Sequence, residues 1–201
     1  MRRVLLYVPM HRELPVARSS WFMQYAPDTE IDIFIMRSNP HPGKGAYPNL
    51  DIKNEAARRA AIVGRYDELF IVEDDVVLPV DALAELLSAH APFIVALYRG
   101  RPENWGSDRL SVRIYDPEGP QDADDRPLEL MDIPADNPII TCTGIAMGCT
   151  LIHRTLFETI EGVVGRDYEL GKRLMENGIP MLCHTGVRCG HVTAKGEIIE
   201  V

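Results

Sequence analysis

Three consecutive carboxylates, Glu73, Asp74 and Asp75, follow directly after the apolar run 69–72, and a second apolar run, 76–78, comes after them. Such a run is typical of a buried strand, and three like charges at its end repel one another and lose hydration unless a cation neutralises them. Carboxylate oxygens suit Mg²⁺ or Mn²⁺, which need only one or two protein carboxylates when substrate phosphates complete the shell. The alternative is a solvated acidic turn that only ends a strand.

Strands and helices alternate around this triplet. The apolar runs predict strands at 4–8, 31–36, 69–72 and 92–98, and helical spacing predicts helices at 16–25, 54–61 and 81–90. In the second half we expect a hairpin of strands at 110–115 and 127–133, a small-residue apolar run at 139–152, a helix from 153, a short helix from 167, a strand over 181–192 and a flexible tail over 193–201. The pattern predicts an α/β fold with a mostly parallel central sheet flanked by helices. With 201 residues, the chain is expected to form one domain, 1–201.

Charge and composition exclude several classes of protein. The net charge of −9 argues against a nucleic-acid partner, which would require a clustered basic surface. No apolar run approaches the roughly 20 residues of a transmembrane segment, and residues 1–10 lead into charged residues without a cleavage site, as a first strand does. The four cysteines lack the density of a disulfide scaffold, so we expect a cytoplasmic protein.

The order of elements around the triplet resembles the donor half of GT-A fold glycosyltransferases, family 2-like. In that family a helix with an Asn or Arg near its start, here the one carrying Arg58, precedes a strand that ends in a D-x-D motif, here Glu73-Asp74-Asp75. The resemblance implies that Glu73 faces the donor ribose and that Asp75 holds the divalent ion on the donor diphosphate. It also places Asp74 and Arg58 in the donor site.

The loop after the first strand is a second part of that donor site. Nucleotides dock after the first strand in open α/β sheets, and the Pro-containing loop of the family lines the donor pocket. Pro9 and His11 are therefore candidates to bind the donor, while a plain surface loop is the alternative for His11.

Two later segments extend the resemblance. The stretch from Gly165, with Arg166 where the family has Glu, resembles the E-D motif, in which Asp167 would be the catalytic base of an inverting enzyme and Glu169 the fallback. The alternative for Asp167 is an N-terminal helix cap. His191, after Gly190, fits the histidine that completes the metal shell in many GT-A enzymes.

The function implied is metal-dependent transfer of a sugar from a nucleotide-diphosphate sugar to a carbohydrate or other hydroxyl acceptor, with Mn²⁺ or Mg²⁺ as cofactor. Residues of about 1–100 would form the donor half and about 101–201 the acceptor half. One alternative is a catalytically silent nucleotide- or carbohydrate-binding module on the same scaffold. A metal-dependent phosphohydrolase fits less well, since no second carboxylate cluster is evident for a two-metal site.

Overall fold

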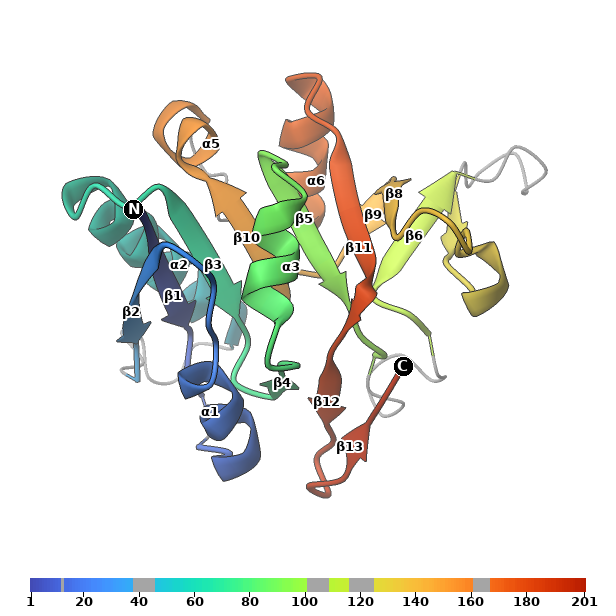
Figure 1. The fold of residues 1–201 in the computed structure, drawn as a ribbon, viewed down its shortest axis with the longest axis horizontal. Coiled ribbons are helices and arrows are strands. Elements are labelled where there is room, and N and C mark those ends of the chain that lie inside the picture. Colours follow the sequence, from blue (N-terminus) through green and yellow to red (C-terminus); the bar gives the residue numbers. More distant parts are fainter. Residues whose placement is uncertain (12, 38–45, 101–108, 116–124, 161–166) are drawn as a thin grey trace.

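A seven-stranded sheet, with strands from both halves of the chain, forms the centre of the molecule (Figure 1). A computed structural model describes residues 1–201 except 12, 38–45, 101–108, 116–124 and 161–166, and describes only the backbone at 46–49, 115, 125 and 167–169. The strands lie in the order β2 (Thr29–Ile35), β1 (Arg2–Val8), β3 (Glu68–Val72), β10 (Cys149–His153), β5 (Phe93–Leu97), β11 (Met181–Arg188) and β8 (Ile139–Cys142).

The direction of the strands confirms the predicted α/β sheet and adds one feature. β1 pairs in parallel with β2 and β3, and β11 pairs in parallel with β5. Between β3 and β5, however, β10 is inserted antiparallel to both, and β8 runs antiparallel to β11 at the edge. The sheet is therefore mixed, although β10 and β8 alone run against the other strands.

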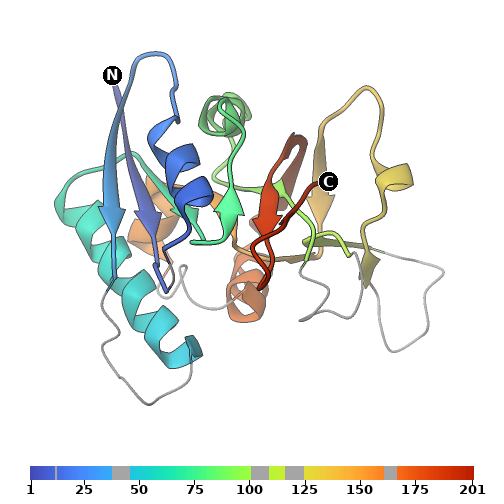
Figure 2. The ribbon, with the colours of Figure 1, turned by 90° about the horizontal axis from the view of Figure 1, so that it is seen from below.

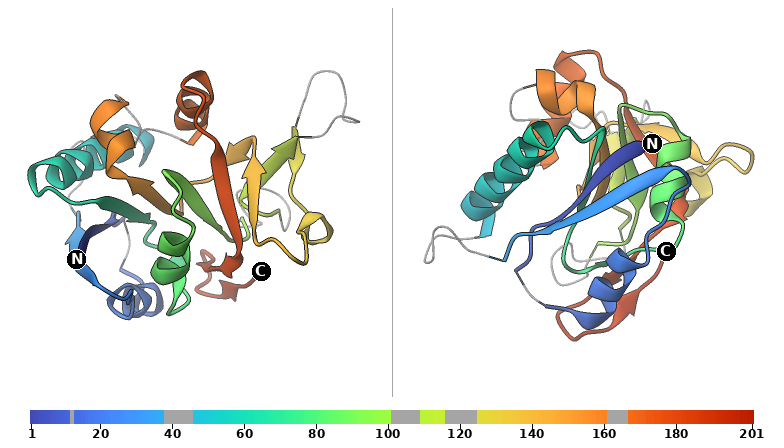
Figure 3. Two further views of the ribbon diagram at one scale, coloured as in Figure 1. Left: turned by 45° about the horizontal axis from the view of Figure 1, so that its top comes forward. Right: turned by 60° about the vertical axis from the view of Figure 1, so that its left-hand side comes forward.

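Helices cover both faces of this sheet, which gives the molecule two cores (Figures 2 and 3). Alternate side chains of a strand point to opposite faces, so Leu6 of β1 packs toward α1 (Pro15–Phe22) and α3 (Ala82–Ser88), whereas Leu5 joins the core beside the other helices. Those helices are α2 (Ala46–Val63), α5 (Arg154–Thr159) and α6 (Asp167–Glu176). Within the described ranges, none of the helices is long and apolar enough to cross a membrane.

The predicted antiparallel pairing in the second half is present, but the described second strand overlaps the predicted one, 127–133, at residue 127 alone. β6 (Val112–Tyr115) pairs antiparallel with β7 (Asp125–Pro127) and with β9 (Gly144–Ile145). Beyond β7 the prediction of a strand is wrong, because residues 130–132 form a 3₁₀ turn, η1 (Leu130–Asp132). Asp132 stabilises this turn by accepting hydrogen bonds from Arg126 Nη1 at 2.6 Å and from the backbone N–H of Glu129 at 2.8 Å.

A small sheet joins the end of the chain to the acidic triplet. β4 (Val76–Val77), which begins directly after the triplet, pairs antiparallel with β12 (Gly190–Val192), and β12 pairs with β13 (Ile198–Ile199). The prediction of a flexible tail is therefore wrong at 198–199. The register places His191 opposite Val76, which brings a residue near the C-terminus next to Asp75.

Candidate functional site

The acidic triplet lies between β3 and β4, at the edge of the sheet where the carboxyl ends of β1, β3, β5 and β11 meet (Figure 1). In open α/β sheets this is the edge at which ligands bind. The backbone N–H of Glu73 donates to the carbonyl of Gly148 at 2.9 Å, and Val76 N–H donates to the carbonyl of Glu73 at 3.1 Å, which closes the turn. Asp74 and Asp75 are only 5% and 4% exposed, so these carboxylates lack the hydration of a solvated turn.

Asp74 ties the loop after β1 to the triplet. Its Oδ2 accepts a hydrogen bond from the backbone N–H of His11 at 2.5 Å. Pro9 is buried at the start of this loop, whereas the His11 side chain is exposed. The structure thus brings together three of the residues predicted to bind the donor, and it connects Asp74 to the backbone of the loop.

Lys53 of α2 is a buried cation at the same edge, and no sequence motif singled it out. Its side chain is fully buried, and its Nζ donates to the carbonyl of Met10 at 3.1 Å. Burial lowers the pKa of Lys53, and the charge of Asp74 acts in the opposite direction. One signal was available in the sequence: Lys53, Ala57 and Ala61 are spaced by four residues, which places them on one face of a helix. The structure buries all three, so Lys53 lies on the apolar face of α2.

Asp75 and His191 face each other although they are far apart in the sequence. Asp75 Oδ1 lies 3.4 Å from His191 Nε2, and the backbone N–H of Val192 donates to the carbonyl of Asp75 at 2.8 Å. His191 Nδ1 lies 2.7 Å from the carbonyl oxygen of Arg99, which can only accept, so Nδ1 carries the proton. In the neutral imidazole, Nε2 therefore presents its lone pair toward a carboxylate oxygen. Nε2 is buried and makes no hydrogen bond within the part of the chain that the structure describes.

This arrangement fits a divalent cation. Two atoms 3.4 Å apart can both reach one ion with bonds of about 2.1 Å. Among the described residues, no group of three His, Cys, Asp or Glu side chains is placed to hold a metal. An ion here would thus have Asp75 and His191 as protein ligands, with its other positions filled by substrate or water. One oxygen and one nitrogen ligand suit Mn²⁺ better than Mg²⁺, which prefers oxygen throughout.

Tyr98 and Gly148 support the imidazole of His191. The rings of Tyr98 and His191 meet edge to face with centroids 5.3 Å apart, and the Tyr98 hydroxyl accepts a hydrogen bond from Gly148 N–H at 3.1 Å. A Cβ at position 148 would lie only 2.7 Å from the Tyr98 ring, so glycine is needed for this approach.

Two further predicted site residues, Arg58 and Asp167, belong to α2 and α6, the helices on the face of the sheet away from α1 and α3. Arg58 donates to the carbonyl of Phe157 in α5 at 2.8 Å and to Glu55 at 2.7 Å. α6 spans Asp167–Glu176 within the described residues, and residues 177–180 connect it to β11. The side chains of Asp167 and Glu169 lie outside the described residues, so their roles remain predictions.

Comparison with known proteins bears on the fold alone. No family model and no curated protein matches the sequence. The chain is similar to the crystal structure of A197 from STIV, with a TM-score of 0.55 at 15% identity over 100% of this chain and 94% of that one. Two solved structures overlap more loosely: a glycosyltransferase involved in the glycosylation of the major capsid of PBCV-1 (TM-score 0.47, 10% identity, 92% of this chain and 82% of that one) and CMP:2-keto-3-deoxy-manno-octonic acid synthetase complexed with CTP (0.49, 10%, 100% and 94%). Fold and geometry together define a mixed α/β protein with a buried carboxylate–imidazole pair at the carboxyl edge of its sheet.

Proposed function

We propose that this protein is a metal-dependent glycosyltransferase that moves a sugar from a nucleotide-diphosphate sugar to a carbohydrate or other hydroxyl acceptor. The observation that carries the proposal is the buried pair of Asp75 and His191, 3.4 Å apart, in which the imidazole is oriented by the Arg99 carbonyl. A backbone carbonyl on the far nitrogen is the usual way in which a protein orients a metal-binding histidine. The pair also lies where a nucleotide would dock in a sheet of this kind.

Each residue at the edge has a separate role in donor binding. Asp75 and His191 would hold the ion, and Glu73, half-buried at the start of the turn, would face the ribose. Asp74 keeps the loop of Pro9 and His11 beside the triplet. A divalent ion bound here would neutralise the donor diphosphate and act as a Lewis acid on the leaving group. Without such a cation, the carboxylates would repel the diphosphate.

The transfer itself requires one proton to be removed. As the acceptor hydroxyl oxygen bonds to the anomeric carbon, the bond from that carbon to the diphosphate oxygen breaks, and its electron pair leaves with the diphosphate. In an inverting reaction the hydroxyl proton passes to a base, a role that we assign to Asp167 at the start of α6. A retaining reaction would not need this base.

A catalytically silent module that binds the nucleotide or carbohydrate is the second candidate. Arg166, in place of the usual Glu before Asp167, favours it. The two candidates share donor binding and differ in turnover, which makes them separable by one pair of measurements.

The first measurement is calorimetric titration of UDP- and GDP-sugars in Mn²⁺ and then in EDTA. We expect binding in Mn²⁺ and its loss in EDTA, and equal affinity in the two conditions would eliminate the metal role. The second is release of nucleoside diphosphate from the same donors in the presence of hydroxyl acceptors. Release that depends on an acceptor supports a transferase, whereas binding without release supports the silent module.

A further inference from the structure

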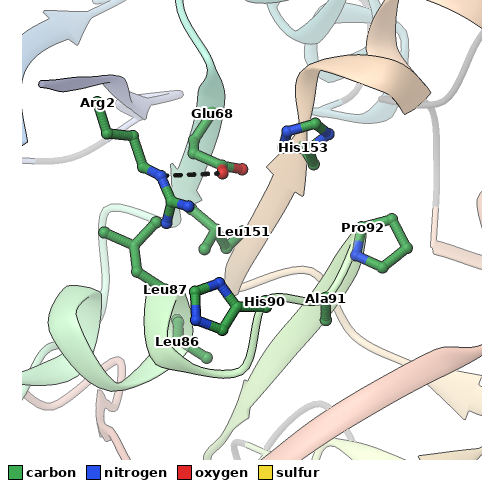
Figure 4. A pocket seen from close by; sticks show the side chains of 9 residues that line it. All are labelled: Arg2, Glu68, Leu86, Leu87, His90, Ala91, Pro92, Leu151 and His153. Carbon is green, nitrogen blue, oxygen red and sulfur yellow. Dashed lines mark ion pairs between the residues drawn. The ribbon is translucent and has the colours of Figure 1, made fainter.

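A second site lies at the opposite edge of the sheet, where a cavity of about 260 Å³ opens beside the start of β3 (Figure 4). Glu68, the first residue of β3, lines it, so the cavity and the acidic triplet lie at opposite ends of one strand. A neighbouring hollow of about 340 Å³ shares Arg2, Leu87 and His90 with the cavity and adjoins it. Since a water molecule takes up about 30 Å³ of liquid, the cavity has room for a small organic molecule.

Glu68 is the chemical centre of this cavity. Its side chain is 4% exposed, and its Oε2 is buried without a hydrogen bond to any residue that the structure describes. Arg2 Nε lies 3.8 Å from the other carboxylate oxygen, which is too far for a hydrogen bond. Burial raises the pKa of Glu68 to about 7. A buried carboxylate without a hydrogen-bond donor is costly, and a ligand that donates to this carboxylate from the cavity would offset that cost.

The surroundings of Glu68 limit the charge of such a ligand. Figure 4 shows its carboxylate between Arg2 on one side and His153 on the other, with His90 below. A purely cationic ligand would lie beside the guanidinium of Arg2, and a purely anionic one beside the carboxylate of Glu68. A zwitterion avoids both conflicts, because its ammonium group pairs with Glu68 while its carboxylate pairs with Arg2.

The geometry and the lining together point to one class of ligand. The charged groups of Arg2 and Glu68 are 3.8 Å apart at their nearest atoms, a spacing that suits two charges separated by a single carbon. The remaining wall includes apolar side chains of α3, Leu86 and Leu87, and Leu151 of β10. We propose that this cavity binds a small α-amino acid, with the ammonium on Glu68, the carboxylate on Arg2 and an apolar side chain on Leu86 and Leu87. This site is separate from donor binding at the other edge.

Three matched probes test the proposal by calorimetric titration without sugar nucleotide: L-leucine, isoamylamine, which lacks the carboxylate, and 4-methylpentanoate, which lacks the amine. We expect L-leucine to bind at least tenfold more tightly than either analogue. Glu68→Gln and Arg2→Gln should each weaken that binding tenfold or more. Glu30→Gln is the matched control, because it removes an exposed carboxylate that pairs with Arg3 at 3.2 Å, and it should leave binding unchanged.

Several results would overturn the proposal. If none of the three probes binds at about 20 mM, a concentration well above a millimolar Kd, the cavity is not an amino-acid site. Equal binding of isoamylamine and L-leucine would show that Arg2 does not recognise the carboxylate. Unchanged binding of L-leucine by Glu68→Gln would place the ligand elsewhere. Thermal unfolding of each variant checks that it is folded. If Glu68→Gln does not fold, Arg2→Gln still tests the proposal, because the Arg2 side chain is partly exposed and its loss disturbs the core less.

Discussion

The two ends of β3 both bury carboxylates, but the protein treats them differently. At the carboxyl end, Asp74 accepts a backbone hydrogen bond from His11, and Asp75 faces His191. At the amino end, Glu68 is equally buried, yet its ion pair with Arg2 is loose, at 3.8 Å, and its second oxygen has no hydrogen bond within the described chain. Carboxylates that are buried to the same extent therefore differ in their hydrogen bonds and ion pairs, because the residues around them differ.

The carboxyl end of β3 is fixed by its neighbours, whereas the charge at its amino end responds to pH. The carboxyl end is held by β4 pairing with β12 and by the contact of Asp74 with the loop after β1, so it is organised before any ligand arrives. The amino end keeps a carboxyl whose pKa of about 7 lies close to neutral pH. Its charge therefore depends on pH and on what occupies the cavity.

The largest effect is expected from Asp167→Asn, which tests whether chemistry belongs to the carboxyl edge. If Asp167 takes the acceptor proton, turnover should fall by about 10²–10⁴, the usual contribution of a positioned base, while donor affinity and thermal stability stay nearly constant. Steady-state kinetics and calorimetry measure the two quantities. Unchanged turnover with stability lower by about 1 kcal/mol would instead identify Asp167 as a helix cap.

The next effect concerns Asp75 and His191, whose shared ion a double-mutant cycle can test. Either single change to Ala should remove most Mn²⁺-dependent donor binding, and the double change should cost little more, because ligands of one ion act as a unit. Glu68→Gln, at the other end of β3, should leave donor binding unchanged. In a crystal grown with donor and Mn²⁺, His191 Nε2 should lie about 2.0–2.4 Å from the ion.

The competing account of His191 predicts a different pattern in the same experiment. If His191 is only a buried structural residue, His191→Ala lowers thermal stability but retains Mn²⁺-dependent donor binding. An ion held by Asp75 with the imidazole turned away would likewise rule out the shared site.

Much of the fold follows from local sequence pattern. The first-half strands and helices could be predicted because their apolar runs and helical spacing are short-range features, and the triplet could be recognised because its three acids are consecutive. The antiparallel insertion of β10 between β3 and β5 could not, since strand order is decided by packing between distant segments. The pairing of β12 with β4 was likewise hidden, and only the resemblance singled out His191.

Lys53 and Glu68, two buried charges outside the triplet, show a second limit. Lys53 could have been found from its spacing with Ala57 and Ala61 on one helix face, but its partner at Met10 could not, because that contact joins separate elements. Glu68 precedes the predicted strand 69–72 and resembles an ordinary charged residue in a connection. It is buried through residues as distant as Arg2 and His153, which no local pattern reveals.

Glu68→Gln should make the fold more stable above neutral pH, an effect smaller than those on activity. Since the pKa of Glu68 is raised from 4.5 to about 7, the folded state binds more protons than the unfolded state between these values, so wild-type stability falls as pH rises through this window. Gln carries no charge and removes that loss, which is on the order of 1–3 kcal/mol at pH 8 and near zero at pH 4. The substitution leaves in place the other charged or titratable groups around this carboxyl, which are Arg2, Asp67, His90 and His153.

Urea unfolding of wild type and Glu68→Gln at pH 5 and pH 8 measures this difference. Glu30→Gln is again the control, and its effect should be small at both pH values because its ion pair is exposed. A wild-type excess of stability at pH 8 would show that ionised Glu68 is stabilised in the fold, which would contradict the contrast between the two ends of β3.

The smallest effect is expected at His90, which lines the amino-end cavity with a φ of 50°. A side chain in this left-handed region strains the backbone, and glycine relieves the strain, although glycine also gives the unfolded chain more freedom. The net gain expected for His90→Gly is therefore only about 0.5 kcal/mol. Arg65→Gly is a matched control, since Arg65 has a φ of 56° and does not line the cavity. If the His90 imidazole contributes to the cavity site, both variants gain stability in urea unfolding, but His90→Gly alone weakens binding of L-leucine. The contrary outcome is that His90→Gly loses stability while Arg65→Gly gains it. That outcome would mean that the packing of the His90 imidazole offsets its backbone strain. The contrast between the two ends of β3 would then rest on Glu68 alone.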